Sequence, residues 1–132
     1  MQPLHSLAGH SMTVLPYGLA TATTPPRFSS QVFESVCQDA QRGAVPIYGR
    51  LDRAPRGADS LVIILHGIAS THNDSYVRQL AKQLNERGLD ALRITLRGAT
   101  CKGHDHYHAG QIDDLLALTA DPQLSTYTSL FL

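Results

Sequence analysis

The chain has 132 residues, of which 42% are apolar, so its length suffices for one domain with a modest core. Eleven basic and eleven acidic side chains give a formal net charge of zero, which excludes a strong electrostatic preference for nucleic acid or an anionic membrane surface. No apolar run is long enough to span a bilayer, and the first residues lack the basic start and apolar core of a secretory signal.

The first part of the chain divides into an irregular start and a predicted hairpin. Residues 1–30 contain four prolines and no sustained periodicity, so we expect an extended arm there and a folded part over residues 31–132. Residues 31–37 and 45–51 are rich in β-branched and aromatic side chains, and Gly43 lies between them. This pattern predicts two strands joined as a β-hairpin.

The apolar run of residues 61–65 is the clearest strand signal in the chain. Its lack of alternation predicts a strand that is buried on both faces, as in covered parallel sheets. After a polar loop, a helix is expected to begin at an Asn73 or Asp74 cap and to end at Gly88 in a left-handed conformation. The apolar stripe of this helix is predicted to comprise Tyr76, Val77, Leu80, Ala81 and Leu84.

The remaining pattern completes an alternating α/β unit. Residues 90–96 predict a second buried strand, and after a long loop residues 111–119 predict a second helix, which Pro122 stops. Residues 126–132 predict a third strand of the same kind. Strand, helix, strand, helix and strand in this order indicate a parallel sheet with right-handed crossovers. The second helix is predicted to face inward with Ile112, Leu115, Leu116 and Thr119.

Asp113 and Asp114 could be mistaken for a pair of catalytic carboxylates. Adjacent residues on a helix point about 100° apart, so the two side chains cannot converge on one substrate atom. Both suit the first turn of a helix, where they oppose the positive end of its dipole. We predict instead that one of the two, Asp114, pairs with Arg97 and ties the long loop back to the sheet.

Several short motifs, in their order and spacing, resemble the α/β-hydrolase superfamily, and within it the YheT-like esterase group related to plant and animal ABHD-type hydrolases. The motifs are His10 and Thr13 within residues 9–16, Leu65-His66-Gly67, Tyr76-Val77-Arg78, Leu96-Arg97-Gly98, and Tyr107-His108-Ala109-Gly110 with Asp113-Asp114. The resemblance covers nearly the whole chain. It implies the N-terminal part of an α/β-hydrolase sheet, in which an early β-hairpin precedes a parallel β-α-β-α-β unit. It also implies a carboxylic ester as substrate, no cofactor, and structural roles for Tyr107 and Gly110.

The resemblance gives a chemical role to His66 and Gly67. In this superfamily the loop after the third strand supplies one backbone amide of the oxyanion hole, and in this sequence that amide would belong to Ile68. A preorganised N–H aimed at the negative charge of a tetrahedral intermediate stabilises the transition state. Gly67 would let the backbone approach the substrate without a side chain in the way. Ala69 and Ser70 stand where a Gly-rich continuation is commoner, so the loop is expected to depart from the family geometry.

The catalytic triad is missing from these residues. The superfamily's nucleophile lies in a Gly-x-Ser-x-Gly elbow after the fifth strand, and no such motif occurs in the sequence. Ser11 is the nearest partial match, but it precedes every predicted strand. We therefore expect a truncated polypeptide that is inactive alone and only marginally stable. Its final strand, with Leu130, Phe131 and Leu132, would form an exposed sheet edge that favours self-association.

A second chemistry is suggested by residues 101–108, which gather a thiol, a carboxylate and three imidazoles. Such groups suit zinc or copper, and the candidate ligands are Cys101, His104, His106 and His108. No second ligand cluster with conventional spacing occurs in the sequence, so a solvated loop is favoured over a metal site.

Three classes of function stay open: the N-terminal segment of a serine esterase, a non-catalytic α/β binding module, and a metal-binding loop protein. The absence of Gly-x-Gly-x-x-Gly and of a Gly-rich phosphate loop after Leu65 disfavours a dinucleotide or flavin module. Cys37 and Cys101 are the only cysteines and form no redox or metal-like pair, which fits a reducing, cytoplasmic location.

Overall fold

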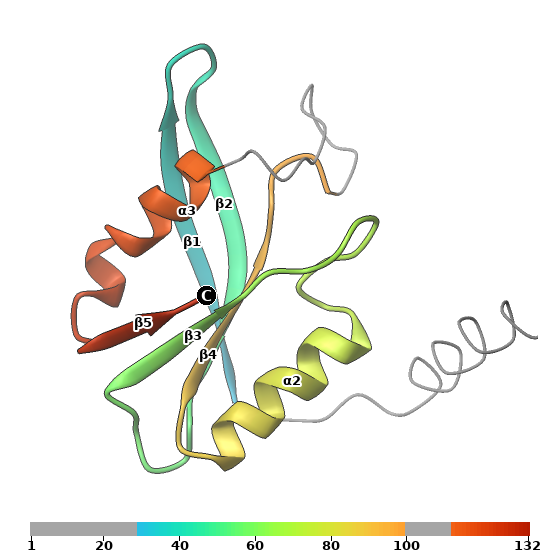
Figure 1. Ribbon diagram of the computed structural model, residues 1–132. Helices are drawn as coiled ribbons and strands as arrows, with labels where there is room; N and C mark the ends of the chain where they lie inside the picture. The colour runs from blue at the N-terminus through green and yellow to red at the C-terminus, as the bar shows by residue number, and fades with distance from the viewer. Residues whose placement is uncertain (1–28, 100–111) are drawn as a thin grey trace, which may run out of the picture.

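The computed structural model describes residues 29–99 and 112–132, which form a five-stranded mixed sheet with a helix on each face (Figure 1). The elements in chain order are β1 (Ser30–Asp39), β2 (Gly43–Asp52), β3 (Ser60–Ile64), α2 (Ser75–Glu86), β4 (Asp90–Thr95), α3 (Ile112–Thr119), the 3-10 helix η1 (Pro122–Leu124) and β5 (Ser129–Phe131). The strand order in the sheet is β1-β2-β4-β3-β5. In the described part of the chain, neither helix has the length and apolar character needed to cross a membrane.

The predicted hairpin is confirmed by β1 and β2, which pair antiparallel along their full length. Gly43 begins β2 with a φ of 74°, a left-handed conformation that favours glycine at this turn. The carboxylate of Asp39 closes the turn by accepting hydrogen bonds from the N–H groups of Gln41 and Arg42, at 2.9 and 3.0 Å. Both strands are longer than the sequence predicts, because their pairing continues to the turn itself.

Strand β4 is the centre of the sheet. It pairs antiparallel with β2 and parallel with β3, and its residues from Asp90 to Ile94 are all buried. Gly49 of β2 lies close to the backbone of β4: a Cβ atom at this position would come within 2.4 Å of the carbonyl oxygen of Arg93. Glycine in a strand often marks such a close backbone approach.

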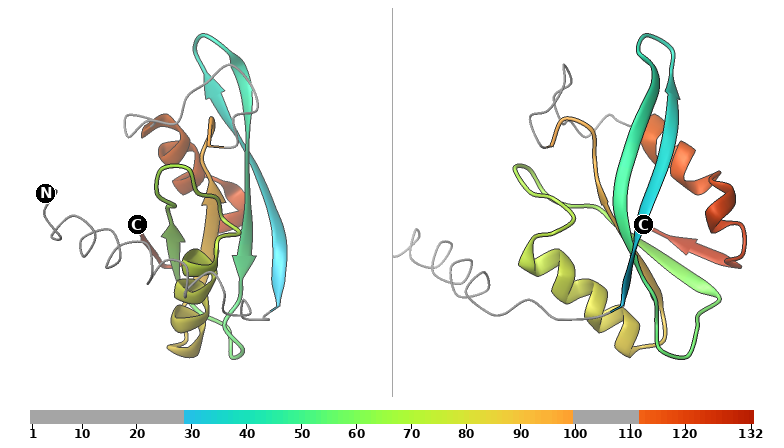
Figure 2. Two further views of the ribbon diagram at one scale, coloured as in Figure 1. Left: turned by 90° about the vertical axis from the view of Figure 1, so that its right-hand side faces the viewer. Right: turned by 180° about the vertical axis from the view of Figure 1, so that it is seen from behind.

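The two faces of the sheet carry different cores, because alternate residues of β3 and β4 point in opposite directions. The larger core lies beneath α3 and η1 and comprises Phe33, Cys37, Ile47, Leu51, Leu61, Ile63, Leu92, Ile94, Leu96, Leu118 and Leu124. The smaller core lies beneath α2 and comprises Ile64, Val77, Ala81 and Ala91. Figure 2 shows from two further sides that α3 lies beside the hairpin and α2 beside β3 and β4.

Helix α2 ends at Glu86, and Gly88 follows its C-cap residue Arg87 in the left-handed conformation that the sequence predicts. Gly88 adopts a φ of 80°, and its N–H donates to the carbonyl oxygen of Asn85 at 3.0 Å. The N–H of Leu89 donates to the carbonyl oxygen of Leu84, also at 3.0 Å. Together these bonds form a Schellman motif, which satisfies carbonyl groups that would otherwise lack a partner.

The buried face of α2 differs from the predicted stripe, because Tyr76 and Leu80 are exposed and Asn85 is buried. The Nδ2 group of Asn85 donates to the backbone oxygens of Asp52 and Leu89, at 3.0 and 2.9 Å. A buried amide is tolerated when its donors are satisfied in this way. Hydrophobic periodicity cannot detect such a residue, because its partners lie elsewhere in the chain.

The orientation predicted for α3 is wrong for Ile112, Leu116 and Thr119, whereas Leu115 packs against the larger core as predicted. Ile112 and Leu116 are 59% and 60% exposed and Thr119 is also exposed, whereas Asp114 and Leu118 are buried. Ile112 and Asp114 are two residues apart, so about 200° of helical rotation separates their side chains. The helix therefore turns its acidic residue inward, where Arg97 neutralises it.

Two strand boundaries also differ from the prediction. Strand β3 ends at Ile64, so Leu65 is exposed at the start of the following loop. Strand β5 contains only residues 129–131. Before it, Tyr127 donates its hydroxyl hydrogen to Asp90, and the Thr128 N–H donates to the carbonyl oxygen of Asp59. The parallel pairing of β5 with β3 is nevertheless as predicted.

Substitution of Gly49 tests the close contact between β2 and β4. The variant Gly49→Ala places a Cβ atom against the backbone oxygen of Arg93, which cannot move without disturbing the central strand. We expect urea unfolding to show a loss of roughly 3 kcal/mol. Gly67→Ala is the matched control, because its Cβ would meet only the Tyr76 hydroxyl at 3.6 Å. Equal stabilities of the two variants would contradict the contact.

Candidate functional site

The β3 loop, defined here as residues 65–74, leaves the carboxyl end of β3. In α/β sheets this is the edge at which ligands bind. The loop contains His66, Gly67 and Ile68, and it contacts the end of β4 through Thr95 and Leu96. These three consecutive residues therefore lie at the carboxyl edge of the sheet.

His66 is buried and joins the β3 loop to β4. Its Nε2 atom accepts a hydrogen bond from the N–H of Leu96 at 3.1 Å, so the ring proton must lie on Nδ1. Nδ1 then donates to the carbonyl oxygen of Gly67 at 2.8 Å. Both ring nitrogens are occupied by backbone groups, so the neutral imidazole supports the loop and is not placed to act as a catalytic base.

The hydroxyl of Tyr76, in the first turn of α2, reaches back to the β3 loop. It lies 2.8 Å from the amide nitrogen of Gly67 and 2.8 Å from Oγ of Ser70. The Ser70 hydroxyl contacts the carboxylate of Asp74, which also accepts the N–H of Thr71 at 2.9 Å. Asp74 precedes α2 as predicted, but its side chain makes no helix-cap bond because it is directed into the loop.

Ile68 carries the backbone amide that the sequence predicts for the oxyanion hole. The side chain is 87% exposed, and within residues 29–99 and 112–132 the backbone N–H has no protein acceptor. Ala69 follows with a φ of 57°, a left-handed conformation that costs an alanine roughly 1 kcal/mol. Within the described part of the chain, the Ile68 N–H is therefore a donor that no backbone or side-chain group uses.

His72 anchors the far end of the β3 loop to the sheet. Its N–H donates to Oγ1 of Thr95 at 3.0 Å, and its Nδ1 lies 2.5 Å from the same oxygen. Its carbonyl oxygen accepts a hydrogen bond from Arg93 at 2.5 Å. Arg93 in turn pairs with Asp52, with Nε 2.5 Å from Oδ2. Burial, and then the positive charge of Arg93, lower the pKa of His72.

Arg97 forms the ion pair with Asp114 that the sequence predicts. Its Nε atom lies 2.9 and 3.0 Å from the two carboxylate oxygens, and a second pair joins its NH1 to Asp39 at 2.6 Å. The bond to Asp114 is the main cause of the raised pKa of Arg97. The N–H of Gln41, followed by Arg97, lowers the pKa of Asp39. Arg97 thus joins the end of β4 to both the hairpin and α3.

Cys37 lies beside this ion pair but is not a candidate nucleophile. Its side chain belongs to the larger core, and burial raises the pKa of the thiol. A hydrogen bond with Asp114 raises it further. The thiolate is the reactive form of cysteine, so this environment keeps Cys37 inert at neutral pH.

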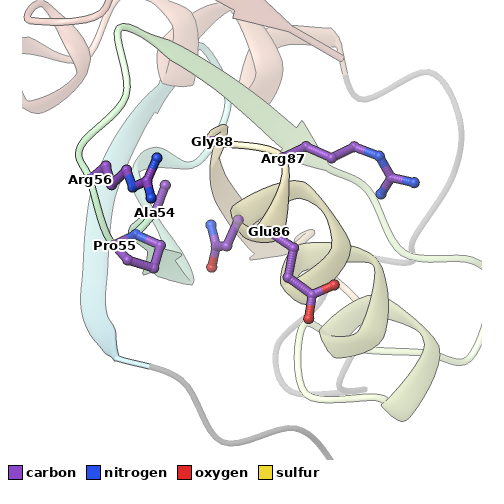
Figure 3. A pocket seen from close by; sticks show the side chains of 7 residues that line it. Ala54, Pro55, Arg56, Glu86, Arg87 and Gly88 are labelled. Atoms are coloured by element: carbon purple, nitrogen blue, oxygen red, sulfur yellow. The ribbon is translucent and has the colours of Figure 1, made fainter.

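A separate cavity of about 550 Å³ lies at the opposite edge of the sheet, between the loop after β2 and the end of α2 (Figure 3). It is lined by Ala54, Pro55, Arg56, Asn85, Glu86, Arg87 and Gly88. The five residues of β3 separate this edge from the β3 loop by roughly 17 Å, given the rise of a strand. Among the described residues Oδ1 of Asn85 has no partner, but it is shielded from solvent, so a ligand in the cavity would not reach it. We do not assign this cavity to the candidate site.

Other predicted site residues lie outside the part of the chain that the structure describes. They are Cys101, His104, His106, Tyr107, His108 and Gly110, together with His10 and Thr13 of the N-terminal motif. The metal-binding loop and the structural roles of Tyr107 and Gly110 therefore stay predictions.

Four groups of the β3 loop and α2 were not predicted as site residues: Ser70, His72, Asp74 and the hydroxyl of Tyr76. One signal was available, since residues 70–74 are rich in side chains that bond nearby backbone groups. That signal predicts a structured turn. It does not reveal that Tyr76 and Thr95, on other elements, complete the turn's hydrogen bonds.

Comparison with solved structures identifies the fold. The chain resembles an esterase from Pyrococcus furiosus with a TM-score of 0.57 at 22% identity, covering 82% of this chain and 45% of the esterase. It resembles a dienelactone hydrolase from Anabaena variabilis with a TM-score of 0.53 at 22% identity, covering 76% and 50%. A bacterial brefeldin A esterase gives a TM-score of 0.52 at 17% identity, covering 89% and 35%. These proteins have the α/β-hydrolase fold, so the described sheet is part of that fold.

The chain spans half or less of the length of these three structures. No family model matches the sequence, and a search of curated proteins finds no match. The comparisons therefore establish the fold, while activity has to be argued from the site.

The lowered pKa of His72 predicts how stability depends on pH. The folded state favours the neutral ring, so its full contribution is present above the ordinary pKa of about 6.5 and is lost as the pH falls toward the lower folded value. We expect urea unfolding between pH 7.5 and 5.5 to show a larger loss of stability in the wild type than in His72→Gln. The two proteins share all carboxylates, so parallel curves would contradict the assignment.

Proposed function

We propose that this chain is the N-terminal part of a carboxylic-ester hydrolase of the serine α/β-hydrolase type, and that its β3 loop supplies one oxyanion-binding amide. The observation that carries the proposal is the Ile68 N–H, which has no acceptor among the described residues and lies at the carboxyl edge of the sheet. The strand order and the structural neighbours support it at the level of fold.

The proposed chemistry requires from the loop only one backbone N–H group held in a fixed direction. Attack on an ester carbonyl moves negative charge onto the carbonyl oxygen, and an N–H already oriented toward that oxygen stabilises the charge without reorganisation. This role is supported by the hydrogen bonds that hold the Gly67 carbonyl to His66 and the Gly67 N–H to Tyr76, which restrain the backbone on the N-terminal side of Ile68. The role assigned to Ile68 is therefore that of a backbone donor.

The proposal assigns no nucleophile to these 132 residues, because the sequence contains no Gly-x-Ser-x-Gly. In the proposed enzyme the nucleophile, acid and histidine belong to sequence that this chain does not contain. We further propose that the chain is related to the YheT-like group, based on the motifs around Leu65, Tyr76 and Leu96. We also propose a cytoplasmic location. The proposed substrate is a small carboxylic ester.

The proposed role of Ile68 can be tested in a protein that joins this chain to a nucleophile-bearing segment. Ile68→Pro removes the amide hydrogen, so we expect kcat for p-nitrophenyl acetate to fall by roughly 100- to 1,000-fold. Ile68→Ala keeps the hydrogen and removes only exposed side-chain atoms, and should lower kcat less than about threefold. Similar kcat values for the two variants would refute the oxyanion role.

The 132-residue chain itself should neither hydrolyse p-nitrophenyl acetate nor react with a fluorophosphonate probe. A serine hydrolase labelled under the same conditions serves as the positive control. Covalent labelling of any serine in this chain would show that it contains a nucleophile that the missing elbow motif does not reveal, and would overturn this part of the proposal.

We also propose that the 132-residue chain self-associates through β5. Within the described residues β5 is paired on one side only, and Phe131 and Leu132 are exposed beside it. Analytical ultracentrifugation at tens of micromolar should show dimers or larger species, and Phe131→Lys should shift them toward monomer. Val32→Lys on the opposite edge strand is the matched control. A monodisperse, cooperatively melting wild-type monomer would contradict the proposal.

A further inference from the structure

We infer that Tyr76 is a positioning residue that, together with His66, fixes the direction of the Ile68 N–H. The inference deepens the proposed function and rests on it for its catalytic meaning. Its structural part depends only on hydrogen bonds among the described residues.

The hydrogen bonds around Tyr76 can run in only one direction. The carboxylate of Asp74 can only accept, so the Ser70 hydroxyl donates its hydrogen to Asp74. Oγ of Ser70 must then accept the hydrogen of the Tyr76 hydroxyl at 2.8 Å. The oxygen of Tyr76 is left to accept the N–H of Gly67, also at 2.8 Å. Each of these four groups therefore has a defined role.

The planar geometry of the peptide bond links the position of the Gly67 carbonyl to the direction of the Ile68 N–H. In a planar trans peptide the N–H points away from the carbonyl of the same unit. The carbonyl of the Gly67–Ile68 unit is held by Nδ1 of His66 at 2.8 Å. The N–H of the preceding unit is held by Tyr76. With the Gly67 carbonyl held by His66, the Ile68 N–H must point to the opposite side of the same peptide unit, and it forms no hydrogen bond within the described residues.

The two contacts come from different elements of the fold. His66 is itself bonded to the backbone of Leu96 at the end of β4, whereas Tyr76 belongs to α2. The loop needs such support, because Ala69 holds a left-handed backbone conformation that alanine does not favour. A preorganised donor costs less free energy to align at the moment of reaction than one on a loop that changes conformation.

Amide hydrogen exchange of the 132-residue chain, measured by NMR, tests the contact without any assay of ester hydrolysis. In Tyr76→Phe we expect the Gly67 amide to exchange at least fivefold faster and the Ile68 amide resonance to shift. Amides in the interior of α2 should keep their rates, because Tyr76 is exposed and phenylalanine retains its ring. Tyr48→Phe, at another exposed tyrosine, is the control and should leave Gly67 unchanged. If Tyr76→Phe does not fold, Ser70→Ala removes the acceptor of the Tyr76 hydroxyl and should accelerate Gly67 exchange in the same way.

An unchanged exchange rate at Gly67 would overturn the inference, as would acceleration spread evenly over α2. In a protein completed with a nucleophile, Tyr76→Phe should lower kcat about tenfold with KM unchanged, and a change confined to KM would also overturn it. The two experiments can give different answers. If Tyr76→Phe accelerates exchange of the Gly67 amide but Ile68→Pro leaves kcat unchanged, the Tyr76 contact is established and the oxyanion role is rejected. The failure of one is thus distinguishable from the failure of the other.

Discussion

The guanidinium of Arg93 is the group on which both the sheet and the candidate site depend. It lies on the central strand, 3% exposed, and pairs with Asp52 of β2, which is fully buried. One of its nitrogens also donates to the carbonyl oxygen of His72 in the β3 loop. Removing one partner of a buried pair leaves the other charge uncompensated and typically costs about 3–5 kcal/mol. The pairing of β2 with β4 and the placement of the β3 loop are therefore coupled through one side chain.

Two further polar clusters hold the connections at opposite edges of the sheet. At the carboxyl edge, Arg97 links the end of β4 to Asp114 of α3 and to Asp39 of the hairpin. At the amino edge, the buried carboxylate of Asp90 accepts the N–H of Ala54 at 2.7 Å and the hydroxyl of Tyr127 at 2.6 Å. Burial, followed by the bond to Asp90, raises the pKa of Tyr127 to about 12, so the hydroxyl keeps its hydrogen at neutral pH. Apolar burial stabilises the packing of the helices on the sheet, and these carboxylates determine which loops and strand ends lie next to one another.

The sequence predicted most of the elements because their signals are local. The apolar run after Ser60 and the left-handed Gly88 depend on neighbouring residues only, and both predictions are confirmed. The orientation of α3 was mispredicted because the burial of Asp114 depends on Arg97, 17 residues earlier in the chain. That ion pair was itself predicted. The prediction did not take into account that burying Asp114 turns Ile112 and Leu116 toward the exposed side of the helix. The hydrogen bonds of the β3 loop could not be predicted, since they join side chains whose proximity only the tertiary fold creates.

The hairpin of β1 and β2 reaches the edge of the sheet that carries the β3 loop. Because β2 runs antiparallel to β4 and pairs with it only from Tyr48 to Asp52, the first five residues of β2 project past the carboxyl edge of the sheet (Figure 1). The hairpin tip therefore lies at the same edge of the sheet as the β3 loop, and the Asp39–Arg97 ion pair ties it to the end of β4. Residues 40–42 belong to neither core, so an insertion in this turn would lengthen the projection beyond the sheet edge without replacing any core residue.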